Sequence, residues 1–322
     1  MSNPVQAHAP ALVPAPAPLA SPPAPAAAPV KIVWPSPGNV ITTKAGMEYT
    51  IGNQIGSGGY ALVFEGTDLF GNAVALKVFK PANRPFDEVQ AQWQKESHLF
   101  EKLRHPNVVA IYDAFVCDNL FYIVLERAWG RLCDYVDRFK PLPEVAVREI
   151  ARQLLFAAHY IHTHGVVHRD ITVVNALVFE GPQSKGPLFK ISDFGISKEF
   201  VDPWQDKICH THIAHPCFIP PELIDPKYGF STERADLYHL GLILLYALTG
   251  SLPFNESMSK DQISQLIQEG APRKQAEALK TPLGDYIAVL LRRRNEFRYK
   301  TAIEAWNELK KTPAFVPQTK TP

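Results

Sequence analysis

Three polar residues near the middle of the chain have types and spacing suited to proton transfer and cation binding. Asp170 and Asn175 lie five residues apart, just after a long amphipathic pattern that ends at Gly165. A carboxylate there can accept a proton from a hydroxyl, and an amide oxygen can bind a hard cation such as Mg²⁺. Asp193 follows eighteen residues after Asn175 and supplies a second carboxylate, and the glycine two residues later lets the backbone bend sharply.

These two segments resemble the catalytic loop and the metal-binding motif of protein kinases, which read H-R-D-L-x-x-x-N and D-F-G. Residues 168–175 read His-Arg-Asp-Ile-Thr-Val-Val-Asn, and residues 193–195 read Asp-Phe-Gly. His-Arg-Asp alone would suit an ordinary solvated loop, but the downstream residues argue against that interpretation. The resemblance implies ATP as phosphoryl donor and Mg²⁺ held by Asn175 and Asp193. The catalytic residues that it implies are Asp170, Lys77, Glu96, Asn175 and Asp193.

The resemblance also implies a fold, an α+β two-lobed kinase domain over residues 49–313. A small β-rich N-lobe with one key helix would take about residues 49–125, and a larger helical C-lobe about residues 130–313. Residues 1–38 are rich in proline and alanine, so we expect a disordered linker or tail. A ligand for a proline-recognising module is the alternative for that segment. Residues 314–322 are expected to form a flexible tail.

A glycine-rich turn between two short apolar strands is the first motif along the chain. Residues 56–61 read Gly-Ser-Gly-Gly-Tyr-Ala. Backbone amides of such a turn can approach phosphate closely because glycine has no side chain. A glycine-rich hairpin alone is weak evidence, since many are ordinary turns. Gly56, Gly58 and Val63 match the kinase pattern, whereas Ala61 replaces its third glycine.

The next strand, residues 73–79, carries Lys77 within an apolar pattern. A lysine there either extends to solvent at a sheet edge or meets anions in a binding site. The match to the kinase V-A-I-K pattern implies that Lys77 pairs with the α- and β-phosphates. The helix expected over about residues 86–103 offers Glu96 to orient this lysine. Glu101 is the alternative, but Glu96 keeps the family spacing.

The segment after the strand at residues 120–125 corresponds to the hinge between the lobes in kinases. Backbone groups near Glu126 and Ala128 would bond adenine, with Leu125 at the back of the pocket. Val63, Ala75 and Leu177 could instead be ordinary core residues, and periodicity does not separate the two interpretations. The residues expected around the nucleotide are Ile55, Gly56, Gly58, Val63, Ala75, Lys77, Glu126, Ala128 and Leu177.

Several positions in the second half of the chain are expected to support the site. A helix should begin at Pro143 and end at Gly165, because proline suits the first turn and glycine the C-terminus. The resemblance pairs Glu222, in Pro-Pro-Glu, with Arg298. It also makes Asp236 the carboxylate that anchors the catalytic loop.

Three positions near the expected substrate depart from the pattern of serine/threonine kinases. Thr172 replaces the usual lysine, and His215 replaces a threonine that commonly contacts that lysine and the catalytic aspartate. A protonated His215 could supply part of the missing charge. Val174, the third, replaces a glutamate. Arg131 likewise stands at a position that is often polar or acidic, so the resemblance does not predict attraction of Arg-rich peptides.

The resemblance therefore predicts an ATP-dependent kinase that phosphorylates Ser or Thr of protein substrates. The alternative is a pseudokinase scaffold without efficient turnover, which the substitutions at Thr172 and His215 keep open. Because Arg169 precedes the catalytic aspartate, the loop containing Thr211 is a candidate for phosphorylation by an upstream kinase or by autophosphorylation in trans. An ordinary exposed hydroxyl is the competing interpretation of Thr211.

Composition limits the remaining function classes. The net charge of +1 and the pI near 7.7 predict no nucleic-acid or membrane partner. The longest apolar run, residues 240–248, is far short of the ~20 residues that cross a bilayer and predicts a buried core helix. Four cysteines without metal-type spacing favour free thiols in a reducing compartment, so we expect a cytoplasmic protein.

Overall fold

The computed structural model describes residues 32–58, 61–79, 85–181, 186–194, 198–199, 216–255 and 257–314. The predictions for the Pro/Ala-rich segment up to residue 31 and for the tail from residue 315 therefore lie outside the described residues. Those for Thr211 and His215 lie outside them too.

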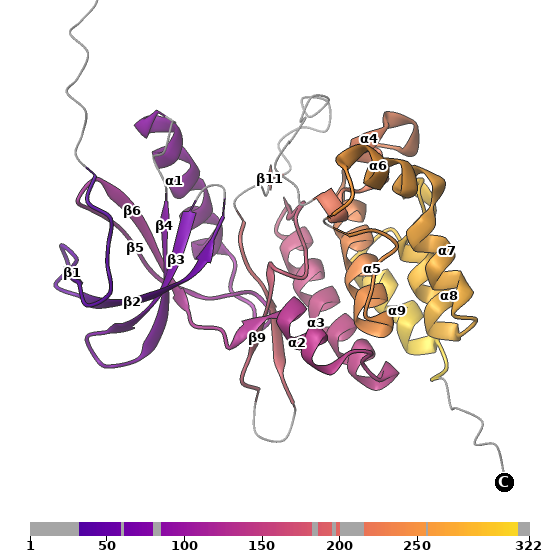
Figure 1. The fold of residues 1–322 in the computed structure, drawn as a ribbon, viewed down its shortest axis with the longest axis horizontal. Coiled ribbons are helices and arrows are strands. Elements are labelled where there is room, and N and C mark those ends of the chain that lie inside the picture. The colour runs from indigo at the N-terminus through magenta and orange to yellow at the C-terminus, as the bar shows by residue number, and fades with distance from the viewer. Residues whose placement is uncertain are drawn as a thin grey trace, which may run out of the picture.

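The first lobe is a six-stranded antiparallel sheet with the order β1-β2-β3-β4-β6-β5 (Figure 1). β4 and β6 lie inside this sheet and are buried almost throughout, which explains their nearly continuous apolar sequences. The sequence analysis assigned no strand to β1, because its three residues are too few to show a pattern. The strands are β1 Val40–Thr42, β2 Glu48–Ser57, β3 Ala61–Asp68, β4 Ala73–Phe79, β5 Ile111–Cys117 and β6 Leu120–Glu126.

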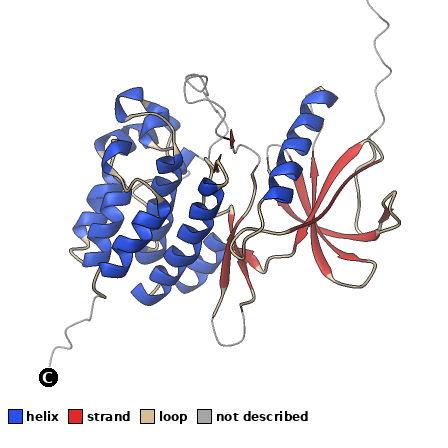
Figure 2. Ribbon diagram, turned by 180° about the vertical axis from the view of Figure 1, so that it is seen from behind, coloured by secondary structure: helices blue, strands red, loops and turns tan. Residues whose placement is uncertain are grey.

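One helix, α1 (Phe86–Lys102), lies against this sheet and confirms the helix expected there (Figure 2). Its buried positions include Val89, Leu99 and Phe100, which recur at helical spacing and face the core. The indole Nε1 of Trp93 donates to the carbonyl of Tyr122 at 2.9 Å and so fixes α1 on β6. The helix thereby brings one buried acid, Glu96, toward the sheet.

The second lobe is mainly helical and is arranged around α5 (Glu233–Thr249) (Figure 1). The other helices are α2 Leu132–Phe139, α3 Glu144–Thr163, α4 Pro221–Ile224, α6 Lys260–Glu269, α7 Ala271–Ala278, α8 Pro282–Leu290 and α9 Ala302–Lys311. Short strands accompany them: β7 Gly130–Arg131, β8 Val166–Val167, β9 Ala176–Phe179, β10 Leu188–Ile191 and β11 Lys198–Glu199.

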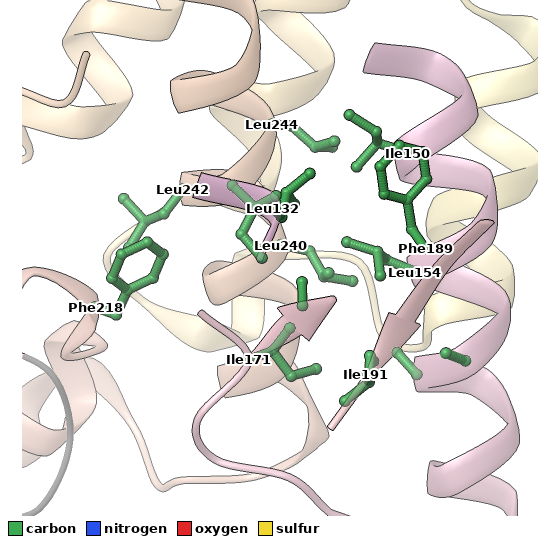
Figure 3. Close-up of a cluster of buried hydrophobic side chains, with 14 of the residues drawn as sticks. Leu132, Ile150, Leu154, Ile171, Phe189, Ile191, Phe218, Leu240, Leu242 and Leu244 are labelled. Carbon is green, nitrogen blue, oxygen red and sulfur yellow. The ribbon is translucent and has the colours of Figure 1, made fainter. Parts of the chain in front are cut away.

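The α5 helix is apolar on nearly every side, as expected of a helix that is buried all round. Figure 3 shows Leu240 and Leu244 of α5 beside Ile150 and Leu154 of α3. Thr232 caps the N-terminus by accepting from the Arg234 amide, and Gly250 ends the helix in the left-handed conformation. The prediction that residues 240–248 form a buried core helix is therefore confirmed.

The two lobes are joined by backbone pairing as well as by the chain itself. Val108 pairs with Ile191 in an isolated parallel bridge. The Val109 amide donates to the Ile191 carbonyl at 2.9 Å, and the Ile191 amide donates to the Asn107 carbonyl at 2.9 Å. The loop after α1 is thus fixed to β10, immediately before Asp193.

A buried ion pair in the second lobe joins α4 to the segment that precedes α9. The guanidinium of Arg298 donates to both carboxylate oxygens of Glu222 at 2.7 Å, and neither side chain is exposed. The guanidinium also lies 4.8 Å from the ring centroid of Tyr238. The predicted pairing of Glu222 with Arg298 is confirmed.

Replacing Arg298 with methionine should destabilise the chain by about 3–5 kcal/mol, because it leaves the Glu222 carboxylate buried without a partner. The measurement is the free energy of unfolding in urea. Arg273→Met is the matched control, since Arg273 pairs with Glu277 on the surface and its loss should cost less than about 1 kcal/mol. Equal losses of unfolding free energy in the two variants would show that the buried pair stabilises the fold no more than the surface pair does.

Candidate active site

The loop between β8 and β9 is held by one fully buried carboxylate, Asp236 of α5. Asp236 accepts hydrogen bonds from the backbone amides of His168 at 2.9 Å and of Arg169 at 2.8 Å. His162 Nε2 lies 2.8 Å from the same carboxylate. Burial opposes ionisation of Asp236, but the hydrogen bond from His162 and the neighbouring charges outweigh burial and lower its pKa. The prediction that Asp236 anchors the loop that carries Asp170 is confirmed.

The backbone of Arg169 needs this anchor. Arg169 has φ +70°, in the left-handed region that costs energy for a residue with a side chain. The hydrogen bond from its backbone amide to Asp236 holds Arg169 in this conformation, and the next residue is Asp170. The position of the Asp170 carboxylate therefore depends on a residue of α5, far along the chain.

Asp170 is fixed from its other side by Asn175. The Asn175 side-chain amide donates to Asp170 Oδ2 at 2.8 Å and to the Asp170 carbonyl at 2.9 Å. The other carboxylate oxygen, Oδ1, is buried and accepts no hydrogen bond from the described residues. Burial raises the pKa of Asp170, and the charge of Asp193 acts in the same direction. A fixed carboxylate with one unused acceptor oxygen suits the transfer of a proton from a hydroxyl.

Lys77 connects two other predicted residues, Glu96 and Asp193. Its Nζ lies 2.5 Å from Glu96 Oε1 and 2.9 Å from Asp193 Oδ1. Burial alone lowers the pKa of Lys77, but the charges of Asp193 and Glu96 outweigh it and raise the pKa, so the ammonium persists. Burial also raises the pKa of Glu96 to about 7, against the opposing effect of Lys77. The lysine of β4, the acid of α1 and the second carboxylate are therefore one connected group.

Edge-to-face and tilted aromatic contacts link α1 to the loop that carries Asp170. Phe194 is fully buried; its ring centroid lies 5.2 Å from that of Phe100 and 4.9 Å from that of His168. Burial lowers the pKa of His168, so its neutral ring donates from Nε2 to the Ser192 carbonyl at 3.0 Å. Asp193, between Ser192 and Phe194, has φ +62°. This packing fixes the direction of Asp193 relative to Lys77.

The apolar residues predicted around a nucleotide come from both lobes. Val63 of β3 pairs with Lys77 of β4, and Ala75 of β4 pairs with Leu125 of β6. Strand alternation therefore places Val63, Ala75 and Lys77 on one face of the sheet. Leu177 of β9 lies close to the hinge, because the Trp129 amide donates to the carbonyl of its neighbour Val178 at 2.8 Å.

The backbone groups of the turn and of the hinge have different hydrogen-bond partners. Gly56 pairs with Val63, and a Cβ at Gly56 would come within 3.4 Å of that side chain. The Gly58 amide donates to the Ala61 carbonyl at 2.9 Å, whereas Ile55 is exposed. In the hinge, the Ala128 amide donates no hydrogen bond within the described part of the chain, and its carbonyl accepts from Arg127 at 2.6 Å.

The structure adds residues that the sequence analysis did not single out. His162 faces Asp236, and Lys190 lies 2.6 Å from both carboxylate oxygens of Glu126. A lysine within the apolar strand Leu-Phe-Lys-Ile was the available signal for Lys190, because a buried ammonium needs an acidic partner. Thr172, which the sequence analysis had already identified as a departure, is fully buried. Its hydroxyl accepts from the Asn175 backbone amide at 3.3 Å, so it stabilises the loop itself.

The oxygen atoms of Asn175 and Asp193 fit a hard divalent cation. Because Asn175 Nδ2 is bound to Asp170, its Oδ1 is directed away from Asp170 and remains for another partner. Among the described residues, no group of three or more His, Cys, Asp or Glu side chains could hold a metal ion. An amide and a carboxylate are thus the donor set that this site offers for Mg²⁺.

Comparison with known proteins places this arrangement in a family. The model of the protein kinase domain matches residues 49–310. The chain belongs to the protein kinase family. The kinase is 33% identical over 218 residues to CBL-interacting serine/threonine-protein kinase 16 of Arabidopsis thaliana, covering 64% of this chain and 45% of the relative. It is 32% identical over 227 residues to probable serine/threonine-protein kinase PknB of Lactococcus lactis, covering 70% and 35%.

Among solved structures, the kinase is similar to Rad53 1-466 in complex with AMP-PNP. The TM-score is 0.65 with 27% identity, over 81% of this chain and 64% of that one. The two-lobed kinase fold is thereby confirmed. The chain spans half or less of the length of the curated relatives that it matches.

The Glu96 carboxyl should titrate with a midpoint near pH 7, well above its ordinary value. Below that pH Glu96 binds a proton and is no longer the negative partner of Lys77. Since the folded chain holds this proton more tightly than the unfolded chain, its contribution to stability is present at low pH and lost as the pH rises through about 7. Carbon-13 NMR of labelled glutamate carboxyls, assigned with Glu96→Gln, measures it. A midpoint below about 5 would contradict this account of burial.

Proposed function

We propose that this kinase transfers the γ-phosphoryl group of ATP to Ser or Thr hydroxyls of protein substrates. One observation carries the proposal: Asp170 is locked by Asn175 at 2.8 Å while Lys77 joins Glu96 and Asp193 in the same site. This is the arrangement that phosphoryl transfer requires, since catalysis depends on positioning and on electrostatic stabilisation.

In the proposed reaction the substrate hydroxyl oxygen forms a bond to the γ-phosphorus, and the bond from that phosphorus to the β,γ-bridging oxygen breaks. ADP leaves with the electron pair of that bond. Asp170 accepts the hydroxyl proton through the Oδ1 that has no donor among the described residues. Lys77, held by Glu96, positions the α- and β-phosphates.

Asn175 and Asp193 would hold Mg²⁺, which neutralises the negative charge of the phosphates when it is bound. Thr172 is turned into the catalytic loop and offers no positive charge to the transferred group. His215 lies outside the described residues, so its contribution is a proposal that rests on its sequence position alone. Apolar packing by Ile55, Val63, Ala75 and Leu177 would enclose the adenine.

Further observations concern the cellular location of the chain and its regulation by phosphorylation. Cys117 and Cys133 are free thiols, which supports a reducing compartment and a cytoplasmic location. No helix in the described ranges is long and apolar enough to cross a bilayer. We also propose that Thr211 is phosphorylated, by an upstream kinase or by this chain in trans, which would add charge near the catalytic loop.

Replacing Asp170 with asparagine should lower phosphate transfer by at least about 100-fold, because the amide cannot accept the hydroxyl proton. The measurement is label transfer from γ-labelled ATP, with Mg²⁺, to generic protein acceptors. Asp285→Asn, an exposed position on α8, is the matched control and should keep full activity.

Absence of transfer by the unmodified chain, combined with stabilisation by ATP in a thermal melt, would instead support the pseudokinase scaffold. Equal transfer by the unmodified chain and Asp170→Asn would reject Asp170 as the proton acceptor.

A further inference from the structure

The side chain of Lys190 makes contacts that the proposed reaction does not use. Its ammonium lies 2.6 Å from both carboxylate oxygens of Glu126 and 4.6 Å from the ring centroid of Phe179. The two charged side chains are only 11% and 14% exposed. Glu126 Oε1 also accepts from the Ala110 amide at 2.7 Å. One hinge carboxylate therefore joins two other segments.

These segments belong to different lobes. Glu126 is the last residue of β6 and Ala110 immediately precedes β5, both in the sheet of the first lobe. Lys190 lies in β10, which pairs with β9 in the sheet of the second lobe. The ion pair thus bridges the lobes at the point where the chain passes from one to the other.

The bridged segment is also the one that would contact adenine. Glu126 lies two residues before Ala128, whose amide donates to no described residue. Rotation of one lobe away from the other would move Glu126 from Lys190 and leave two poorly solvated charges apart. The free energy needed to separate this ion pair opposes opening of the lobes, because two charges removed from water attract each other strongly.

The second hinge pair differs in this respect. Arg127 Nη2 lies 3.5 Å from Glu65 Oε2, and both side chains are considerably more exposed, at 29% and 38%. It joins the hinge to β3 of the same lobe that carries Glu126. Its rupture is therefore not needed for the lobes to separate.

We propose that Lys190 is a positioning residue of the nucleotide site, which holds the hinge closed through Glu126 and slows nucleotide release. The inference rests on the proposed binding of ATP and ADP. Lys190 does not touch the nucleotide in this scheme. It sets how often the lobes open, and release of product from kinases and other enzymes with closing lobes commonly requires such opening.

The test is the dissociation rate of a fluorescent ADP analogue with Mg²⁺, followed by stopped-flow displacement with ATP. Lys190→Met should release the analogue about tenfold faster, with a much smaller change in the association rate, because loss of a buried charged partner acts on dissociation. Lys190→Arg keeps the charge and should stay close to the unmodified rate. Lys140→Met, which removes the exposed pair with Asp137, is the matched control and should change nothing.

A double variant separates bridging from the effect of a stranded charge. Lys190→Met with Glu126→Gln leaves no buried carboxylate without a partner, and glutamine can still accept from the Ala110 amide. Bridging predicts that the double variant releases the analogue as fast as Lys190→Met alone, so the two changes are strongly non-additive. Return of the double variant to the unmodified rate would overturn the inference.

Each of the remaining outcomes also tests the proposed role of Lys190. Unchanged release in Lys190→Met, from a chain that binds the analogue normally, overturns this inference and leaves the proposed function intact. Failure of the unmodified chain to bind any adenine nucleotide overturns both. If Lys190→Met alone does not fold, the comparison of Glu126→Gln with the unmodified chain replaces it, because the introduced glutamine keeps the contact with the Ala110 amide but loses the charge. Faster release is then expected, and an unchanged rate overturns the inference.

Discussion

The buried carboxylate of Asp236 is the interaction on which the candidate active site depends. An ionised side chain is costly to bury unless it is fully hydrogen-bonded, and this one receives two backbone amides and lies against His162. Those amides belong to the two residues before Asp170, one of which has a left-handed backbone. The interaction that holds this loop in place is therefore supplied by α5, the most deeply buried helix of the second lobe.

The first lobe reaches the same loop by a different route. Lys77 of β4 bonds to Glu96 of α1 and to Asp193, and the rings of Phe100, Phe194 and His168 contact one another from α1 to the loop. The polar connection is sensitive to protonation of Glu96, whereas the contact between Phe100 and Phe194 involves no titratable group. A displacement of α1 would disturb both, so the position of one helix controls the arrangement of Lys77 and Asp193 together.

The hinge completes this arrangement. Backbone pairing of residues 107–109 with Ile191 fixes the loop after α1 to the second lobe, and the Glu126–Lys190 pair spans the lobes on β6 and β10. Both connections involve β10, the strand that leads directly into Asp193. The same short strand therefore sets the position of the Asp193 carboxylate and the freedom of the segment expected to bind adenine.

The sequence by itself determined the family and the local elements. The motifs around Asp170, Asp193 and Lys77 are each short contiguous segments, and the extents of α1 and α3 were predicted closely. The apolar run at residues 240–248 predicted only the C-terminal part of α5. Glu96 could be chosen over Glu101 because it keeps the spacing of the kinase family, and the two residues lie in the same helix. The strand β1 was not predicted, because three residues are too few to show the alternation of a strand.

Only the tertiary structure decided which side chains meet. Lys190 and Glu126 are 64 residues apart, and His162 and Asp236 are 74 apart. Thr172 could be recognised as a departure from the lysine of related kinases, but not as a hydroxyl turned inward to Asn175. Local propensity and periodicity act over a few residues, whereas the pairing of buried charges is set by how sheets and helices pack. The chemistry of the site was therefore readable in the chain, and the forces that hold it in position became visible only in the fold.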